Sequence, residues 1–139
     1  MKTVIVADSS GLISLASETD QNYHKAVDIS KNLAKVNGLI IVPSDVFSET
    51  LNIAGKKLGH QAAISTAEAT FSSGTFLILD TTEILRENAF TIFKEQSESV
   101  SFTDCVVMAV ADHFETKEIF GFDEAFRRNG YVRLGIDDK

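Results

Sequence analysis

The chain of 139 residues contains a single cysteine, Cys105. One cysteine cannot form a disulfide within the chain, and the three histidines stand at no spacing that would complete a structural zinc site with it. A chain without structural disulfides is typical of a reducing compartment, so we expect a cytoplasmic protein. No secretory signal is expected either, because Asp8 interrupts the short apolar run that follows Met1.

Long hydrophobic runs and an excess of positive charge are also missing. The longest uninterrupted apolar run covers residues 105–111, far short of the roughly 20 residues that a membrane-spanning helix needs, so we expect no association with a membrane. The 13 Lys and Arg residues against 20 Asp and Glu residues give a net charge of −7. This charge excludes a protein that binds nucleic acid through a broad basic surface. It leaves open an enzyme that reaches phosphates through a bound metal, because carboxylates hold magnesium and the ion supplies positive charge locally.

Short strands and longer helices alternate along the chain, whose length fits one domain over residues 1–139. Apolar and β-branched runs predict the strands, and apolar residues recurring every three or four positions predict the helices. Strands are expected at 3–7, 39–42, 75–79, 118–122 and 131–134. Helices are expected at 12–16, 22–36, 43–58, 60–71, 83–95 and 102–114. This alternation predicts an α/β domain with a mainly parallel central sheet of four or five strands.

Three local signals predict where elements begin and end. Residues 8–11 (DSSG) are expected to end the first strand and to separate it from the next helix. Pro43 is expected to open a helix from within its first turn. Residues 80–83 resemble a capping box for the helix that follows.

Four acidic residues stand where such a sheet places function, outside the carboxyl ends of its strands. Asp8 and Asp123 follow the first and fourth predicted strands, Asp104 opens the apolar helix, and Glu49 lies in the helix after the second strand. Four acids at one edge of a sheet repel one another unless a cation lies between them. One or two Mg²⁺ or Mn²⁺ ions would turn them into an oxygen cage, which activates water and stabilises the leaving oxygen of a phosphodiester. The four acids are therefore candidate metal ligands and catalytic residues.

Each acid also has an ordinary structural explanation. Asp8 suits a turn or cap after a strand, and Asp123 suits a loop. Asp104 is the fourth residue of a Ser-x-x-Asp capping pattern. Glu49 points away from the apolar stripe of its helix, where a solvated side chain is the default. Spacing alone leaves both explanations open for all four.

The order and setting of these acids resemble the PIN-domain family, and the length of the chain suits its VapC-like branch. In that family an aspartate closes the first strand before hydroxyl residues, a helix opens with His and Ala, a glutamate follows a strand-proline-helix segment, and two further acids come later. The matching segments are VADSSGLI (6–13), NYHKA (22–26), VPSDVFSE (42–49), VSFTDC (100–105) and IFGFDEAF (119–126). One departure is Gly121, because the family often has Thr or Ser two positions before its fourth acid.

The resemblance implies a three-layer α/β/α PIN-like domain with a defined set of site residues. The implied metal ligands are Asp8, Glu49, Asp104 and Asp123. Ser9 and Thr103 would supply hydroxyl groups beside the ligands. Arg127 and Arg128 follow Asp123 in a predicted loop, where they would contact an RNA backbone; solvated loop arginines are the ordinary alternative.

A member of this family would hydrolyse RNA phosphodiester bonds with Mg²⁺ or Mn²⁺ as its cofactor, leaving 5′-phosphate and 3′-hydroxyl ends. VapC-like members are commonly toxins held inactive by a small antitoxin protein, and they often form homodimers. The resemblance therefore implies an RNA substrate, an antitoxin partner and a homodimer.

Two other functions fit parts of the sequence. A catalytically silent PIN-like binding module is consistent with Gly121, although acids at all four positions weigh against it. A phosphoacceptor receiver-type signalling domain would use Asp80, which follows the third predicted strand. The paired acids after the first strand and the lysine after the fifth strand that receivers carry are missing, and Asp80 is better explained as a helix cap.

Overall fold

A computed structural model describes residues 2–137. Its centre is a sheet of five strands in the order β3-β2-β1-β4-β5, and every neighbouring pair is parallel. The strands are β1 (Val4–Ala7), β2 (Leu39–Pro43), β3 (Phe76–Leu79), β4 (Glu118–Phe120) and β5 (Val132–Arg133). The predicted parallel sheet is confirmed.

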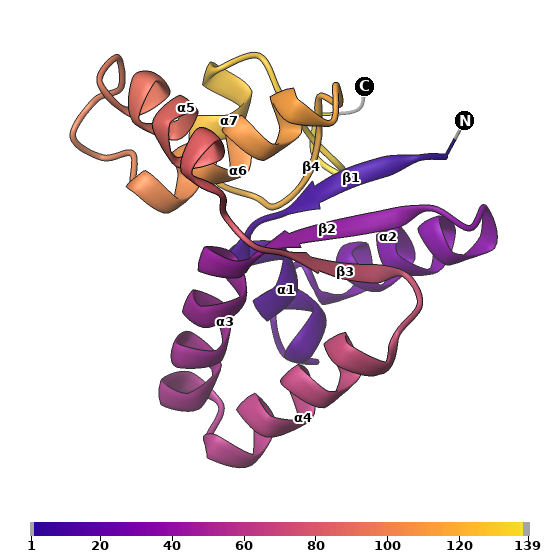
Figure 1. Cartoon of the computed structure of the whole chain (residues 1–139). Helices are drawn as coiled ribbons and strands as arrows, with labels where there is room; N and C mark the ends of the chain where they lie inside the picture. Colours follow the sequence, from indigo (N-terminus) through magenta and orange to yellow (C-terminus); the bar gives the residue numbers. More distant parts are fainter. Residues whose placement is uncertain (1, 138–139) are drawn as a thin grey trace.

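Helices cover both faces of this sheet. They are α1 (Ser9–Ala16), α2 (Tyr23–Lys35), α3 (Ser44–Lys57), α4 (His60–Ser72), α5 (Glu83–Phe93), α6 (Phe102–His113) and α7 (Glu124–Arg128). In Figure 1, α1 to α4 lie on one side of the sheet and α5 to α7 on the other. Parallel strands need crossover connections, and helices supply them here. The molecule is thus the three-layer α/β/α domain that the family resemblance implied.

The core lies where β1 and α6 meet at the centre of the molecule. Residues 5–7 of β1 are fully buried, as expected for a central parallel strand covered on both faces. Every residue of α6 from Asp104 to Ala111 is buried as well, which agrees with the apolar character of its whole circumference. No helix within residues 2–137 is both long enough and apolar enough to cross a membrane.

Two predicted element boundaries and one predicted helix cap are wrong, each for a local reason. The first strand ends before Asp8 as predicted, but the next helix begins at Ser9 and not at residue 12, because Asp8 is the N-cap of α1. Pro43 ends β2 and precedes α3 instead of standing in its first turn. Thr82, and not Asp80, caps α5, since the Thr82 hydroxyl accepts a hydrogen bond from the Leu85 amide at 3.3 Å.

The segment after β4 also differs from its prediction. The strand ends at Phe120, before the predicted limit of 122, and residues 124–128 form α7 instead of a loop. Asp123 caps this helix by accepting a hydrogen bond from the Ala125 amide at 2.8 Å. A helix of five residues is too short to produce a readable apolar period, so the capping aspartate was its clearest sequence signal.

Candidate active site

The carboxyl ends of β1 and β4 meet because the two strands are parallel neighbours, with Ala7 paired to Phe120. The Asp8 amide continues the pairing by donating to the Phe120 carbonyl at 2.9 Å. Asp8 therefore lies directly at the edge where the chain leaves β4 toward Asp123. Its side chain is buried, whereas Asp123 is exposed.

Asp8 is a buried carboxylate with a strongly perturbed acidity. Burial, together with the negative charge of Asp104, raises its pKa from 3.8 to about 6. Hydrogen bonds from the hydroxyl and amide of Ser10 partly oppose this rise. A perturbed acid at the functional edge of an α/β sheet is a site candidate with a physical basis.

Asp104 combines a structural and an electrostatic role at the start of α6. It completes a capping box, because its Oδ2 accepts from the Ser101 amide at 3.2 Å and its own amide donates to the Ser101 hydroxyl at 3.0 Å. Burial raises the pKa of Asp104, and repulsion from Asp123 and Glu49 raises it as well, while the Ser101 hydrogen bonds lower it. The structural explanation is therefore correct but does not exclude a functional one, since all four candidate acids interact electrostatically.

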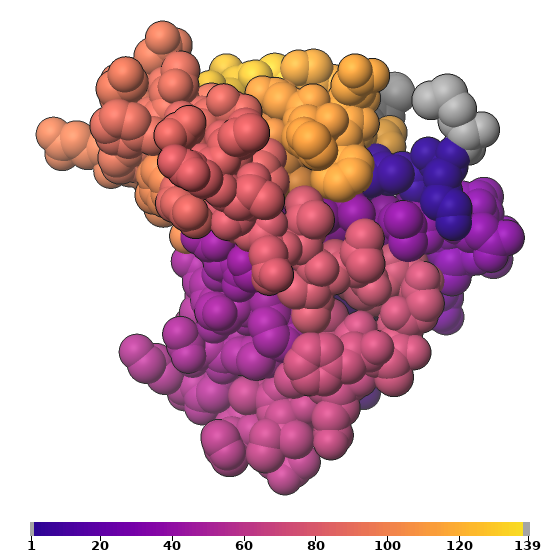
Figure 2. Space-filling view, viewed as in Figure 1, coloured from indigo at the N-terminus to yellow at the C-terminus, as the bar shows by residue number. Residues whose placement is uncertain are grey.

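Glu49 and Thr103 line a polar depression between α3 and the start of α6. Its lining residues are Ser44, Asp45, Ser48, Glu49, Asn52, Ile53 and Thr103. In Figure 2 the left-hand outline is indented here, between α3 and the overhanging segments that precede and begin α6. A separate, mostly apolar pocket between α1, α4 and β3 contains no acidic side chain. The chemistry thus places the candidate site at the α3–α6 edge.

Within residues 2–137, no ion pair joins the negative charge of this site to a Lys, Arg or His side chain. The ion pairs within residues 2–137 join only Glu124 and Asp137 to Arg127 and Arg133. Buried carboxylates are normally paired with a cation or bound to a metal, and carboxylate oxygens are the ligands that Mg²⁺ and Mn²⁺ favour. The donor chemistry fits such an ion. In the same described part of the chain, however, no three His, Cys, Asp or Glu side chains converge closely enough to hold one, so the ligands are not preformed.

Ser10 contributes to the site although sequence reasoning missed it. Its hydroxyl donates to Asp8 Oδ2 at 2.9 Å, whereas no hydrogen bond from the Ser9 hydroxyl to Asp8 is recorded within residues 2–137. Because Asp8 is the N-cap, Ser10 is the second residue of the helix. A capping side chain accepts a hydrogen bond from the amide at this position. Recognising the cap in the DSSG segment would have found Ser10.

The role of Arg133 was also missed, and the two arginines predicted to lie in a loop belong to α7. Arg127 and Arg128 are exposed on a helix, not in a loop, and Arg127 pairs with Glu124. Arg133 is largely buried and donates to the Phe122 carbonyl at 3.1 Å. It therefore fixes the backbone immediately before Asp123.

Comparison with known proteins identifies the family. The family model described as PIN domain matches residues 5–130. The chain belongs to the PIN-domain family. Enzymes of this family are ribonucleases that generally use divalent metal ions. No curated protein matches the chain.

A solved structure agrees with this PIN fold. The crystal structure of Mycobacterium tuberculosis VapC20, described as a sarcin-ricin loop cleaving toxin, superposes with a TM-score of 0.82. The two chains are 23% identical, and the match covers 94% of this chain and 98% of VapC20. At this identity the similarity establishes the fold. The predicted family and the predicted fold are both confirmed.

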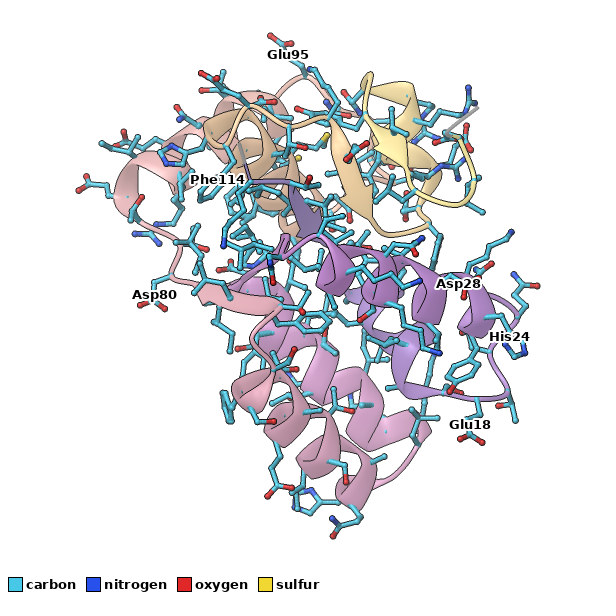
Figure 3. The ribbon with its side chains drawn as sticks, turned by 90° about the vertical axis from the view of Figure 1, so that its right-hand side faces the viewer. Glu18, His24, Asp28, Asp80, Glu95 and Phe114 are labelled. Carbon is cyan, nitrogen blue, oxygen red and sulfur yellow. The ribbon has the colours of Figure 1, made fainter. Side chains whose placement is uncertain are left out.

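The receiver alternative loses its basis. Receiver-type domains have the strand order 2-1-3-4-5, whereas the order in this PIN domain is β3-β2-β1-β4-β5. Asp80 follows the edge strand β3, and Figure 3 shows its side chain projecting outward from the molecule. Asp80 is exposed, whereas Asp8 and Asp104 are buried, so Asp80 lacks the acidic pocket in which a receiver holds its phosphoacceptor.

Proposed function

We propose that this PIN domain is a metal-dependent endoribonuclease that hydrolyses RNA phosphodiester bonds and acts as the toxin of a toxin–antitoxin pair. The observation that carries the proposal is the buried pair Asp8 and Asp104, which repel each other and have no cationic partner within the described residues. A divalent cation bound between the two carboxylates would relieve this repulsion, and the pair would then serve as metal ligands.

The ligands of Mg²⁺ or Mn²⁺ are proposed to be Asp8, Glu49, Asp104 and Asp123. When bound, such an ion activates water for attack and stabilises the leaving oxygen of the phosphodiester. Asp8 accepts a hydrogen bond from Ser10 of α1 and Asp104 accepts one from Ser101, the N-cap of α6, so they supply the rigid half of the site. The side chains of Glu49 and Asp123 are less buried and are proposed to turn toward the ion as it binds.

The RNA is proposed to lie along the α3–α6 edge. Thr103 lines the depression beside Glu49, and we assign it and Ser9 as hydroxyl groups near the ligands. Arg127 and Arg128 follow Asp123 on the surface and are proposed to contact the RNA backbone. These two contacts suit a protein of net charge −7, in which the metal supplies most of the local positive charge.

The proposed partners follow from the VapC-like pattern. VapC20 is a toxin by its description, and its fold matches over nearly the whole of both chains. A small antitoxin protein and a second copy of this chain are the partners we propose, acting in the cytoplasm.

Cleavage of a mixed RNA substrate tests the proposal directly. We expect the purified, antitoxin-free protein to cut RNA with Mg²⁺ or Mn²⁺, and Asp8→Asn to abolish cleavage, because the substitution keeps the shape of the side chain and removes its charge. Asp80→Asn is the matched control and should cut like wild type, since Asp80 is exposed at the edge of the sheet. No cleavage of any RNA by well-folded wild type would contradict a general nuclease.

A silent PIN-like binding module is the second candidate. The match of residues 5–130 to a family of ribonucleases weighs against it, and binding measurements separate the two candidates. Such a module would bind RNA or the antitoxin with the same affinity in wild type and Asp8→Asn, and with the same affinity in EDTA as in Mn²⁺.

A further inference from the structure

The hydroxyl of Ser10 joins two parts of the site that are more than a hundred residues apart in sequence. It donates to Asp8 Oδ2 at 2.9 Å, and it accepts from the Phe122 amide at 2.9 Å. A carboxylate can only accept and an amide can only donate, so both directions are fixed. The hydroxyl thus donates one hydrogen bond to Asp8 and accepts another from the loop that leads to Asp123.

The same loop residue is held from its other side. The Phe122 carbonyl accepts from Arg133 Nη1 at 3.1 Å, and Arg133 is itself fixed by Asp137, at 2.8 Å from Nε and 2.9 Å from Nη2. Both backbone polar groups of Phe122 are therefore bound by side chains. The next residue, Asp123, begins α7 from this fixed point.

Gly121 explains why the link comes from Ser10. A Cβ atom at position 121 would lie 2.6 Å from the Asp8 Cβ, closer than packed carbon atoms approach. The loop after β4 thus passes directly against Asp8 and has no room for a side chain at 121. The side-chain hydrogen bond to this loop therefore comes from α1 and not from position 121.

We propose that Ser10 is a positioning residue that sets the loop carrying Asp123 against Asp8. Its hydroxyl fixes the orientation of the Asp8 carboxylate and the path of the Phe122 backbone in one step. The inference rests on the proposed function only for its consequence, which is that Asp8 and Asp123 reach the same ion. The link itself is a property of the metal-free protein.

The test compares three variants with wild type by two measurements. Ser10→Ala removes the hydroxyl, and Ser10→Thr keeps it. Ser17→Ala is a matched control at the other end of α1, where the Ser17 hydroxyl is hydrogen-bonded to the exposed hydroxyl of Thr19. The first measurement is the hydrogen-exchange rate of the Phe122 amide in metal-free protein, followed by NMR. The second is Mn²⁺ affinity, measured by electron paramagnetic resonance of the unbound ion.

Ser10→Ala is expected to speed exchange of the Phe122 amide and to weaken Mn²⁺ binding by about ten-fold, the usual effect of losing a partner of a metal ligand. Ser10→Thr is expected to stay close to wild type in both measurements, and Ser17→Ala to change neither. Where Ser10→Ala does not fold, Ser10→Thr against Ser10→Val makes the same comparison, because Thr and Val differ only in the hydroxyl.

Unchanged exchange at Phe122 in Ser10→Ala would overturn the proposal, and so would Mn²⁺ affinity equal to that of wild type. A loss in Ser10→Thr as large as in Ser10→Ala would also overturn it, because size and not the hydroxyl would then matter. If wild type binds no Mn²⁺, the proposed metal site fails, while the Phe122 exchange rates still decide whether Ser10 makes the link.

Discussion

The side chain of Asp8 lowers the stability of the folded, metal-free protein. Its carboxylate is 4% exposed, and it lies near another buried carboxylate with no cation beside it in the described part of the chain. Burying such a charge is unfavourable unless a partner neutralises it. The site therefore destabilises the metal-free protein, and an ion that binds there stabilises it.

Asp8→Asn should make the metal-free protein more stable at neutral pH. The rise in the pKa of Asp8 from 3.8 to about 6 means that the folded state holds the ionised form less well than the unfolded state does. Removing the charge should raise the free energy of unfolding by ~1–3 kcal/mol, at 1.4 kcal/mol for each pKa unit. Urea unfolding in EDTA measures it, and a variant less stable than wild type would contradict the account.

Gly121→Ala should be destabilising because of the tight approach of the loop to Asp8. The added Cβ would lie 2.6 Å from the Asp8 Cβ, so the backbone must shift at a cost of about 1–3 kcal/mol. Gly74→Ala is the matched control, since a Cβ at Gly74 meets nothing within 4 Å. Thermal unfolding of both variants checks the prediction, and equal stabilities would show that the loop adapts without strain.

The sequence predicted the four acids in order but not the residues that hold them. Asp8 and Asp104 stand beside local capping signals, and the local reading of each as a cap was correct. Ser10 and Arg133 act on Phe122, which lies 112 and 11 residues away. Contacts of this kind depend on which strands become neighbours, and no local pattern reveals that.

At the scale of elements, periodicity located the long helices and the strands, and its errors lie at junctions. The start of α1 was misplaced, and the cap of α5 was assigned to the wrong residue, because capping residues and not apolar spacing fix where a helix begins. The short helix α7 was missed altogether. These junctions are also where the candidate site lies, so the boundary errors and the missed residues have the same origin.

The ion pair of Arg133 with Asp137 should give stability that depends on pH. The hydrogen bond from Arg133 lowers the pKa of Asp137 from 3.8 to about 2, so the pair stabilises the folded state above pH 4 and loses this effect as the pH falls toward 2. The difference in urea midpoint between wild type and Asp137→Asn should therefore be constant from pH 7 to 4 and shrink below pH 4. A difference that stays the same down to pH 3 would contradict it.

At the scale of the whole molecule, negative charge is spread over the surface. Figure 3 shows Glu18, Asp28, Asp80 and Glu95 projecting from different parts of the protein. RNA must therefore approach a protein of net charge −7 with few favourable contacts to its phosphates. Binding should depend weakly on salt, in contrast to proteins with a basic surface.

Replacing Arg127 and Arg128 together with Gln should raise KM and leave kcat nearly unchanged. These side chains are exposed and lie outside the buried acids, so they are proposed to affect binding and not chemistry. Each lost phosphate contact should reduce the slope of log affinity against log salt by ~0.7 for single-stranded RNA. Kinetics at several salt concentrations measure both effects, and an unchanged KM would remove these arginines from the RNA-binding surface.

We expect the carboxylates of this PIN domain to cleave RNA by holding a divalent metal ion, and the chemical ends of the cleaved RNA check this expectation. RNA is incubated with wild type, Asp8→Asn and Asp104→Asn, each with Mn²⁺ and with EDTA, and the product ends are identified. Wild type with Mn²⁺ should leave 5′-phosphate and 3′-hydroxyl ends, and the other samples should give no products. Cleavage that continues in EDTA, or that leaves 2′,3′-cyclic phosphate ends, would contradict it.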